Sequence, residues 1–105
     1  MAFVRAAALA DVPPGESLGV EIGGQRVCLA RIEDEVYAVR DVCSHREFPL
    51  AGGEVDPDDC SITCEWHGAR FDLRTGAALC LPATLAVPVY AVRVEDGEIL
   101  VDVGG

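Results

Sequence analysis

Residues 41–82 read DVCSHREFPLAGGEVDPDDCSITCEWHGARFDLRTGAALCLP. Glycine, proline and acidic residues interrupt every apolar run in this stretch, so any strands within it must be short. Loops of this length inside a compact domain usually carry function or are held by something other than a core. The stretch therefore predicts a loop-rich insert with a site of its own.

The chain on either side of the insert follows the pattern of β-strands. Apolar residues recur at every second position and valine is abundant, which is typical of half-buried strands. We expect three hairpins, formed by residues 20–22 and 27–29 around Gly23-Gly24, by residues 29–32 and 36–39, and by residues 87–94 and 99–103 around Asp96-Gly97. The sequence predicts an all-β protein.

Length and charge restrict the function further. The chain has 105 residues, which allows a single domain, residues 1–105, with one core. Acidic residues outnumber basic ones 18 to 8, the net charge is −10, and lysine is absent. No basic surface is therefore expected for nucleic acid or an anionic membrane. An acidic surface can serve solubility or docking on basic partners, and the charge alone does not decide between them.

One uncharged stretch has the minimum length of a membrane span. Residues 75–92 run for 18 residues without a charge. Pro82 and Pro88 would each break a helical hydrogen bond, so we expect a buried loop that leads into a core strand. The five cysteines form no even disulfide framework and the start of the chain shows no export signal, so we expect a cytoplasmic protein.

Two short motifs in the insert contain the residues best suited to bind a metal. Cys43-Ser44-His45 is a CxH motif, and Cys64-Glu65-Trp66-His67 is a CxxH motif that begins after 18 intervening residues. Each motif places one sulfur and one nitrogen on a tight loop, and two such loops pressed together close a metal site. We predict that Cys43, His45, Cys64 and His67 are the ligands.

Two kinds of metal centre use these donors. A single zinc ion in a Cys₂His₂ site would stabilise an interaction module. Zinc fingers, however, usually pair Cys with Cys and His with His along the chain and then supply a helix, whereas each motif here holds one of each among strands. In a Rieske [2Fe–2S] centre one iron takes two cysteines and the other takes two histidines, so each loop would give each iron one ligand.

The chain resembles Rieske-type ferredoxins over essentially its whole length, with the four predicted ligands in the ligand positions. The resemblance includes Gly68, the run from Phe71 to Gly76, and Leu81-Pro82-Ala83, which matches the proline-containing loop of the family. It implies the Rieske fold, an antiparallel β-sandwich base with an inserted cluster-binding subdomain, here about residues 41–82. It also implies one [2Fe–2S] cluster per chain.

The residues around the ligands resemble the low-potential branch of the family. High-potential members carry two further cysteines joined by a disulfide, at the positions of Phe48 and Trp66 in this chain. They also donate a serine and a tyrosine hydroxyl near the cluster, at the positions of Ala69 and Phe71. Both donors stabilise the reduced state, so their loss implies a reduction potential near roughly −150 mV.

The resemblance implies an electron-transfer protein that is not itself an enzyme. A ring oxygenase adds a mononuclear iron held by two histidines and a carboxylate, and no histidine is left for it here. We expect a soluble monomeric one-electron carrier that is reduced by an NAD(P)H-dependent ferredoxin reductase and passes its electron to a terminal oxygenase or another iron enzyme. The expected site of transfer is the tip that carries His45, His67 and Pro82.

Three alternatives remain open from the sequence. Two are carriers: the Rieske-like small subunit of nitrite reductase, and a ferredoxin associated with Suf iron–sulfur cluster assembly. The third is the zinc-stabilised interaction module. Among the other residues, Cys28 is expected to be a core thiol, and Cys60 and Cys80 lie in the insert outside the ligand positions. Arg46 follows the first histidine, where it would raise the potential, contact a partner, or be an inert surface residue.

Overall fold

The computed structural model describes residues 3–42, 50–64, 68–79 and 86–103. Within them the chain forms nine strands and one short 3-10 helix. The elements are β1 (Val4–Ala8), η1 (Leu9–Asp11), β2 (Ser17–Ile22), β3 (Gln25–Ile32), β4 (Glu35–Arg40), β5 (Glu54–Asp56), β6 (Ser61–Thr63), β7 (Arg70–Asp72), β8 (Val89–Glu95) and β9 (Glu98–Asp102). The predicted all-β class is confirmed; β1 and η1 were not predicted.

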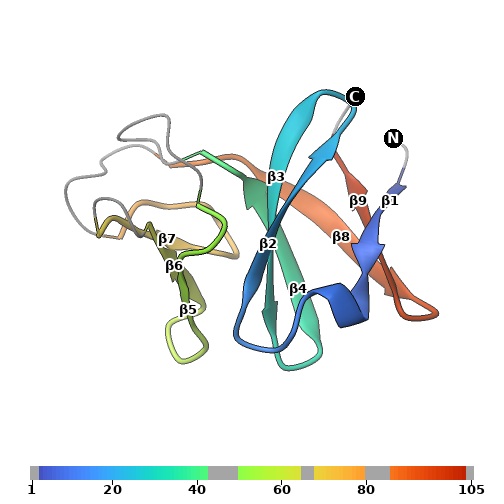
Figure 1. The fold of residues 1–105 in the computed structure, drawn as a ribbon. Coiled ribbons are helices and arrows are strands. Elements are labelled where there is room, and N and C mark those ends of the chain that lie inside the picture. Colours follow the sequence, from blue (N-terminus) through green and yellow to red (C-terminus); the bar gives the residue numbers. More distant parts are fainter. Residues whose placement is uncertain (1–2, 43–49, 65–67, 80–85, 104–105) are drawn as a thin grey trace.

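Two antiparallel sheets make up the molecule (Figure 1). The larger one, which forms the base, has six strands in the order β1-β9-β8-β4-β3-β2, and the smaller one has three in the order β5-β6-β7. Strands β1 and β2, at the two ends of the larger sheet, come close to each other, so this sheet is nearly closed. The strand twist curls the sheet, and its two halves face each other across a core as the layers of a sandwich do.

All three predicted hairpins are present. Ile22 pairs with Gln25 across Gly23-Gly24, whose φ angles of +56° and +83° suit the two-residue turns that match the strand twist. Ile32 pairs with Glu35, so the second turn is one residue shorter than predicted. The third turn is Asp96-Gly97, between β8 and β9.

Strands β3 and β4 separate two cores. From β3, Val27 and Leu29 face the inside of the base and pack in one apolar cluster with residues such as Ile99. The alternate residues, Cys28 and Ala30, belong to a second cluster that lies between the base and the insert. Successive side chains of a strand point to opposite faces, so a strand buried on both faces has an unbroken apolar run.

The three-stranded sheet lies within the predicted insert. Its strands β5, β6 and β7 have three residues each, in agreement with the expectation of short strands. Ile62 and Phe71 from this sheet, with Leu73 just after it, are fully or almost fully buried in the second cluster. Packing against β3 and β4 thus fixes the insert to the base.

The uncharged stretch at residues 75–92 contains no membrane span in its described part. No helix among the described residues is long and apolar enough to cross a membrane. The chain enters β8 after the buried Val87, but no side chain of β8 is buried, so the expectation of a core strand was wrong; Tyr90 and Val92 only pack against the core of the base from its edge. Thr75, Leu79, Ala86 and Pro88 are exposed, Leu79 to 45%, so the expectation of a buried loop was wrong for much of its described part. Ala78 pairs with Phe71 and packs on the core, and strand-like alternation turns the next side chain outward.

Candidate metal centre

The structure describes one of the four predicted ligands. Cys64 follows β6 directly, is completely buried, and belongs to the cluster between the base and the insert. Outside the described residues lie the other three ligands and several residues considered with them, namely Cys43, His45, His67, Arg46, Phe48, Trp66, Cys80 and Pro82. The structure therefore shows the framework from which three segments leave and to which they return.

The CxxH segment leaves and returns within hydrogen-bonding distance. The Cys64 N–H donates to the Ala69 carbonyl at 2.7 Å, and the Gly68 N–H donates to the Cys64 carbonyl at 2.8 Å. These bonds continue the ladder of β6 and β7, in which Thr63 pairs with Arg70. Cys64 and Gly68, the described residues on either side of this segment, are therefore fixed next to each other.

The CxH segment is closed by a side chain. Asp41 follows β4, and its Oδ1 accepts the N–H of Leu50 at 2.8 Å and the N–H of Ala51 at 2.7 Å. The chain thus leaves the base beside Asp41 and returns beside the same residue. Sequence reasoning did not single out Asp41; the available signal was an acidic residue two positions before the first cysteine of the motif.

A third segment, which includes the predicted proline-containing loop, is closed by backbone contacts. The Leu79 N–H donates to the Arg70 carbonyl at 2.8 Å, and the Val87 N–H donates to the Gly76 carbonyl at 2.9 Å. Gly76 has a φ of +79°. The segment therefore starts next to β7, the strand that also ends the CxxH segment.

The closing points of the segments are neighbours. Gly53 lies between the closing points of the CxH and CxxH segments. A Cβ atom at Gly53 would be 2.0 Å from the Thr63 carbonyl oxygen and 3.0 Å from the Leu50 carbonyl oxygen. The hydrogen bond from Leu79 to Arg70 brings the start of the third segment beside the end of the CxxH segment. The CxxH segment and the third segment therefore leave from the same end of the small sheet, and the CxH segment returns to that end, which fits ligands that converge from separate loops.

The other described cysteines, Cys28 and Cys60, do not lie at the ends of these segments. Burial, together with the nearby charge of Asp41, raises the pKa of the Cys28 thiol, which therefore stays neutral inside the core. Cys60 is half-buried near the Tyr37 hydroxyl, which donates to Glu35 Oε2 at 2.6 Å. Thiolates are the form that binds metal, so Cys28 is placed as the core thiol that the sequence predicted.

Two positions near Cys64 have no side-chain hydroxyl. Ala69 and Phe71 are both completely buried and belong to the same cluster as Cys64. The packing around Cys64 is therefore apolar at the two positions where the resemblance to Rieske ferredoxins implied lost donors.

The match to known families agrees with this framework. The Rieske [2Fe-2S] domain family matches residues 2–91 of the chain. The chain belongs to this family. Membership implies a Rieske-type [2Fe–2S] cluster, and the donors of this Rieske domain fit it, because the CxH and CxxH motifs supply the two thiolates and two imidazoles that such a cluster uses.

Similar proteins of this family are ferredoxins of dioxygenase systems. The ferredoxin subunit of 3-phenylpropionate/cinnamic acid dioxygenase from Escherichia coli K12 is 40% identical over 94% of this chain and 92% of its own length. The ferredoxin of carbazole 1,9a-dioxygenase from Nocardioides aromaticivorans IC177 has a TM-score of 0.91 and 40% identity, over 96% of this chain and 97% of that chain.

Two further structures bear on partners and alternatives. One is described as the complex of reduced oxygenase and oxidized ferredoxin in carbazole 1,9a-dioxygenase; it matches with a TM-score of 0.85 and 32% identity, over 94% of this chain and 100% of that chain. The other is a putative NADH-dependent nitrite reductase small subunit from Mycobacterium tuberculosis, with a TM-score of 0.84 and 29% identity over 95% and 93% of the two chains.

Proposed function

We propose that this protein is the ferredoxin component of a Rieske dioxygenase system, a one-electron carrier that transforms no substrate itself. The observation that carries the proposal is the end-to-end match with dioxygenase ferredoxins, at 40% identity with that of Nocardioides aromaticivorans. A carrier needs a cluster and docking surfaces, and one small domain can provide both.

The cluster of this carrier is held by Cys43, His45, Cys64 and His67. Supporting this assignment, the CxH and CxxH segments leave from adjacent points of the framework, and Cys64 lies in an apolar core beside them. When bound, the cluster accepts and releases one electron. Two ferric ions, two sulfides, two thiolates and two neutral imidazoles sum to zero charge, which favours uptake of an electron over an all-thiolate centre.

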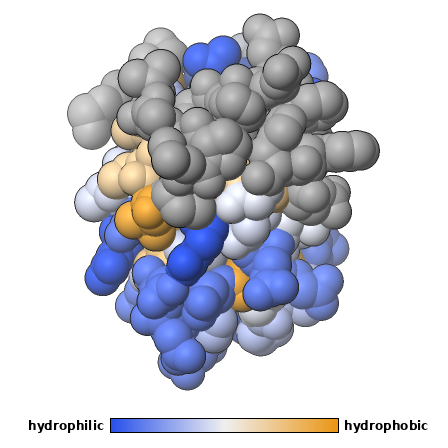
Figure 2. All heavy atoms as spheres, turned by 90° about the vertical axis from the view of Figure 1, so that its left-hand side faces the viewer, coloured by the Kyte–Doolittle hydropathy of each residue, from blue (hydrophilic) through white to orange (hydrophobic). Residues whose placement is uncertain are grey.

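The proposed partners are a nicotinamide-dependent ferredoxin reductase and a terminal oxygenase. Acidic residues gather in the turns between β3 and β4, between β5 and β6, and between β8 and β9, which all lie at the lower end in Figure 1. Figure 2 shows that the described atoms of one side are mostly hydrophilic toward this end. Long-range attraction by such a surface would speed encounters with a basic partner.

The nitrite reductase small subunit remains the second candidate. Its support is the match of a putative small subunit over nearly the whole of both chains, but at 29% identity against 40% for the dioxygenase ferredoxin. Nothing in the structure favours the role in Suf cluster assembly. Membership of the Rieske family argues against the zinc-stabilised module.

Anaerobic stopped-flow mixing tests the proposed function. The reduced holoprotein is mixed in turn with the oxidised terminal oxygenase of a Rieske dioxygenase system and with the catalytic subunit of an NADH-dependent nitrite reductase. The proposal expects bimolecular electron transfer to the oxygenase cluster and none to the nitrite reductase. Transfer to the nitrite reductase alone would assign the second candidate instead.

A further inference from the structure

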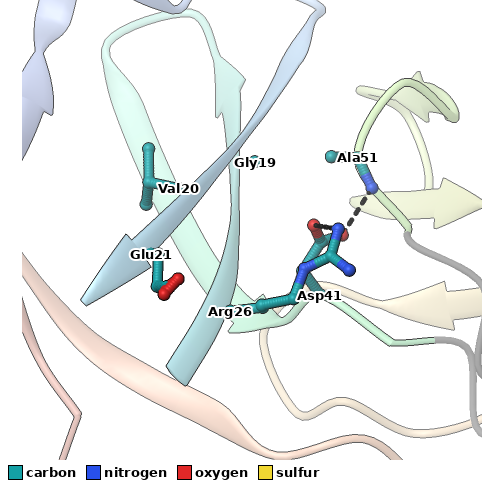
Figure 3. Close-up of a pocket in the computed structure, with 6 residues that line it drawn as sticks. All are labelled: Gly19, Val20, Glu21, Arg26, Asp41 and Ala51. Atoms are coloured by element: carbon teal, nitrogen blue, oxygen red, sulfur yellow. Dashed lines mark hydrogen bonds and ion pairs between the residues drawn. The ribbon is translucent and has the colours of Figure 1, made fainter. Parts of the chain in front are cut away.

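Asp41 joins the base to the end of the first ligand segment (Figure 3). Its Oδ1 accepts the N–H groups of both Leu50 and Ala51, and its side chain is only 2% exposed. We propose that Asp41 is a positioning residue for the cluster: it fixes the two ends of the segment that carries Cys43 and His45. This inference rests on the proposed ligands.

The two hydrogen bonds are of the strong, charge-assisted kind. A carboxylate is the acceptor and two backbone N–H groups are the donors, at 2.7 and 2.8 Å. Leu50 is completely buried, so the loss of the acceptor would leave its N–H without a partner away from water. The return of the chain at Leu50 therefore depends on the Asp41 side chain.

Arg26 of the base holds Asp41 through both its backbone and its side chain, and Gly19 leaves room for the carboxylate. The Asp41 N–H donates to the Arg26 carbonyl at 3.0 Å, and the Arg26 guanidinium lies 3.6 Å from Asp41 Oδ2 (Figure 3). On β2, which pairs with β3, a Cβ atom at Gly19 would be 2.9 Å from Asp41 Oδ2 and 3.1 Å from the Ala51 Cβ. The carboxylate thus lies where β2, β3 and the returning chain meet.

A neighbouring bond extends this junction. The Ser17 Oγ accepts the N–H of Gly52 at 2.9 Å. Three successive N–H groups of the returning chain, at residues 50, 51 and 52, are therefore bound by side chains of the base. Such a row fixes the direction of the returning chain as well as its position.

This arrangement acts on both metal sites of a Rieske centre. The segment between Asp41 and Leu50 carries one thiolate and one imidazole, and these serve different irons. Fixing the ends of a loop lowers the entropy lost when its ligands are held in one geometry. Asp41 would therefore position ligands of both irons through its bonds to the backbone at the end of the segment.

Four variants separate positioning from general stability. Asp41→Ala removes the acceptor. Asp41→Asn keeps an amide oxygen that can accept the same two N–H groups but removes the charge. Gly19→Ala adds a methyl group on β2 that would crowd Asp41 Oδ2. Asp102→Ala is the matched control, because Asp102 is also a buried carboxylate of the base but lies on β9.

The readouts are iron and acid-labile sulfide per chain, the rate at which a chelator bleaches the visible spectrum, and the EPR spectrum of the reduced protein. We expect Asp41→Ala to lose its cluster about tenfold faster than wild type and to show shifted g-values. Gly19→Ala should also speed the loss of the cluster and shift the g-values, but by less than Asp41→Ala. Asp41→Asn should lie between wild type and Asp41→Ala, because its neutral amide oxygen can accept the same N–H groups but more weakly than a carboxylate. Asp102→Ala should keep the wild-type g-values even if it melts at a lower temperature.

The inference is overturned if Asp41→Ala keeps the wild-type g-values and loses its cluster no faster than Asp102→Ala. It is also overturned if Asp41→Asn behaves like Asp41→Ala, because the hydrogen bonds would then not be the cause. The proposed ligands are tested separately by the wild-type spectrum: a wild-type protein without a Rieske signal refutes them whatever the variants do.

Discussion

Gly76 and Val87 lie backbone against backbone. The Val87 N–H donates to the Gly76 carbonyl at 2.9 Å, and a Cβ atom added to Gly76 would be 1.9 Å from the Val87 carbonyl oxygen. Gly76 also has a φ of +79°, a conformation that side chains disfavour. This pair closes the third segment of the candidate metal centre.

Gly76→Ala should lower the free energy of unfolding by about 3 kcal/mol or more, because roughly 1–2 kcal/mol of left-handed strain is added to a backbone clash. Gly15→Ala is the matched control, since Gly15 has a φ of +83° and open space around its Cβ position. Urea unfolding of both variants measures the difference. Equal losses would show that the contact with Val87 adds nothing.

Ala69 and Phe71 give a prediction about the reduction potential. Both are completely buried in the cluster that contains Cys64. The double change Ala69→Ser and Phe71→Tyr restores the two hydroxyl donors of high-potential Rieske proteins, which stabilise the reduced state, so the midpoint potential should rise. Protein-film voltammetry of the variant and the wild type measures the shift. A potential that stays the same or falls would contradict the donor argument.

Tyr37 gives a prediction about pH. The hydrogen bond to Glu35, followed by the neighbouring Cys60, raises the pKa of Tyr37 above its usual value near 10. The folded state therefore favours the neutral phenol. This contribution to stability is fully present below about pH 10 and is lost as the pH rises through the folded-state pKa.

Glu35→Gln should bring the pKa of Tyr37 back toward the usual value, because the substitution removes the carboxylate that accepts the hydroxyl proton. The chain has two tyrosines, so the titration is done in a Tyr90→Phe background, where the phenolate absorbance reports Tyr37 alone. An unchanged titration curve would mean that Glu35 does not hold the phenol in its neutral form.

The acidic surface predicts how fast partners meet. With a net charge of −10, association with a basic reductase should be fast at low salt and should slow by roughly tenfold or more as ionic strength rises to about 0.5 M. Stopped-flow reduction at several salt concentrations measures this. A rate that is independent of ionic strength would assign the charge to solubility alone.

Local patterns were enough to predict the three hairpins of the base, whereas the framework of the site depends on contacts between distant residues. The pair Gly23-Gly24 and the alternation in β3 are readable along the chain. The bonds from Leu50 and Ala51 to Asp41, and the fit of Gly53 against Thr63, join residues nine or more positions apart. The motifs could thus indicate which residues bind metal, but not what holds their segments in place.

Strand β1 escaped prediction for a related reason. Its sequence, VRAAA, has no clear alternation of large apolar and polar residues, and it becomes a strand by pairing with β9 at the other end of the chain. A pairing between the first and last strands has no local signal.

Electron–nuclear double resonance on the dithionite-reduced holoprotein tests the proposed Rieske centre most directly. The measurement detects nitrogen atoms bound to the iron. Ligation by Cys43, His45, Cys64 and His67 predicts one [2Fe–2S] cluster per chain with couplings from two histidine nitrogens. The His45→Ala and His67→Ala variants should each lose this two-nitrogen signal. A reduced cluster without nitrogen coupling, or a colourless protein that contains zinc and no acid-labile sulfide, would contradict it.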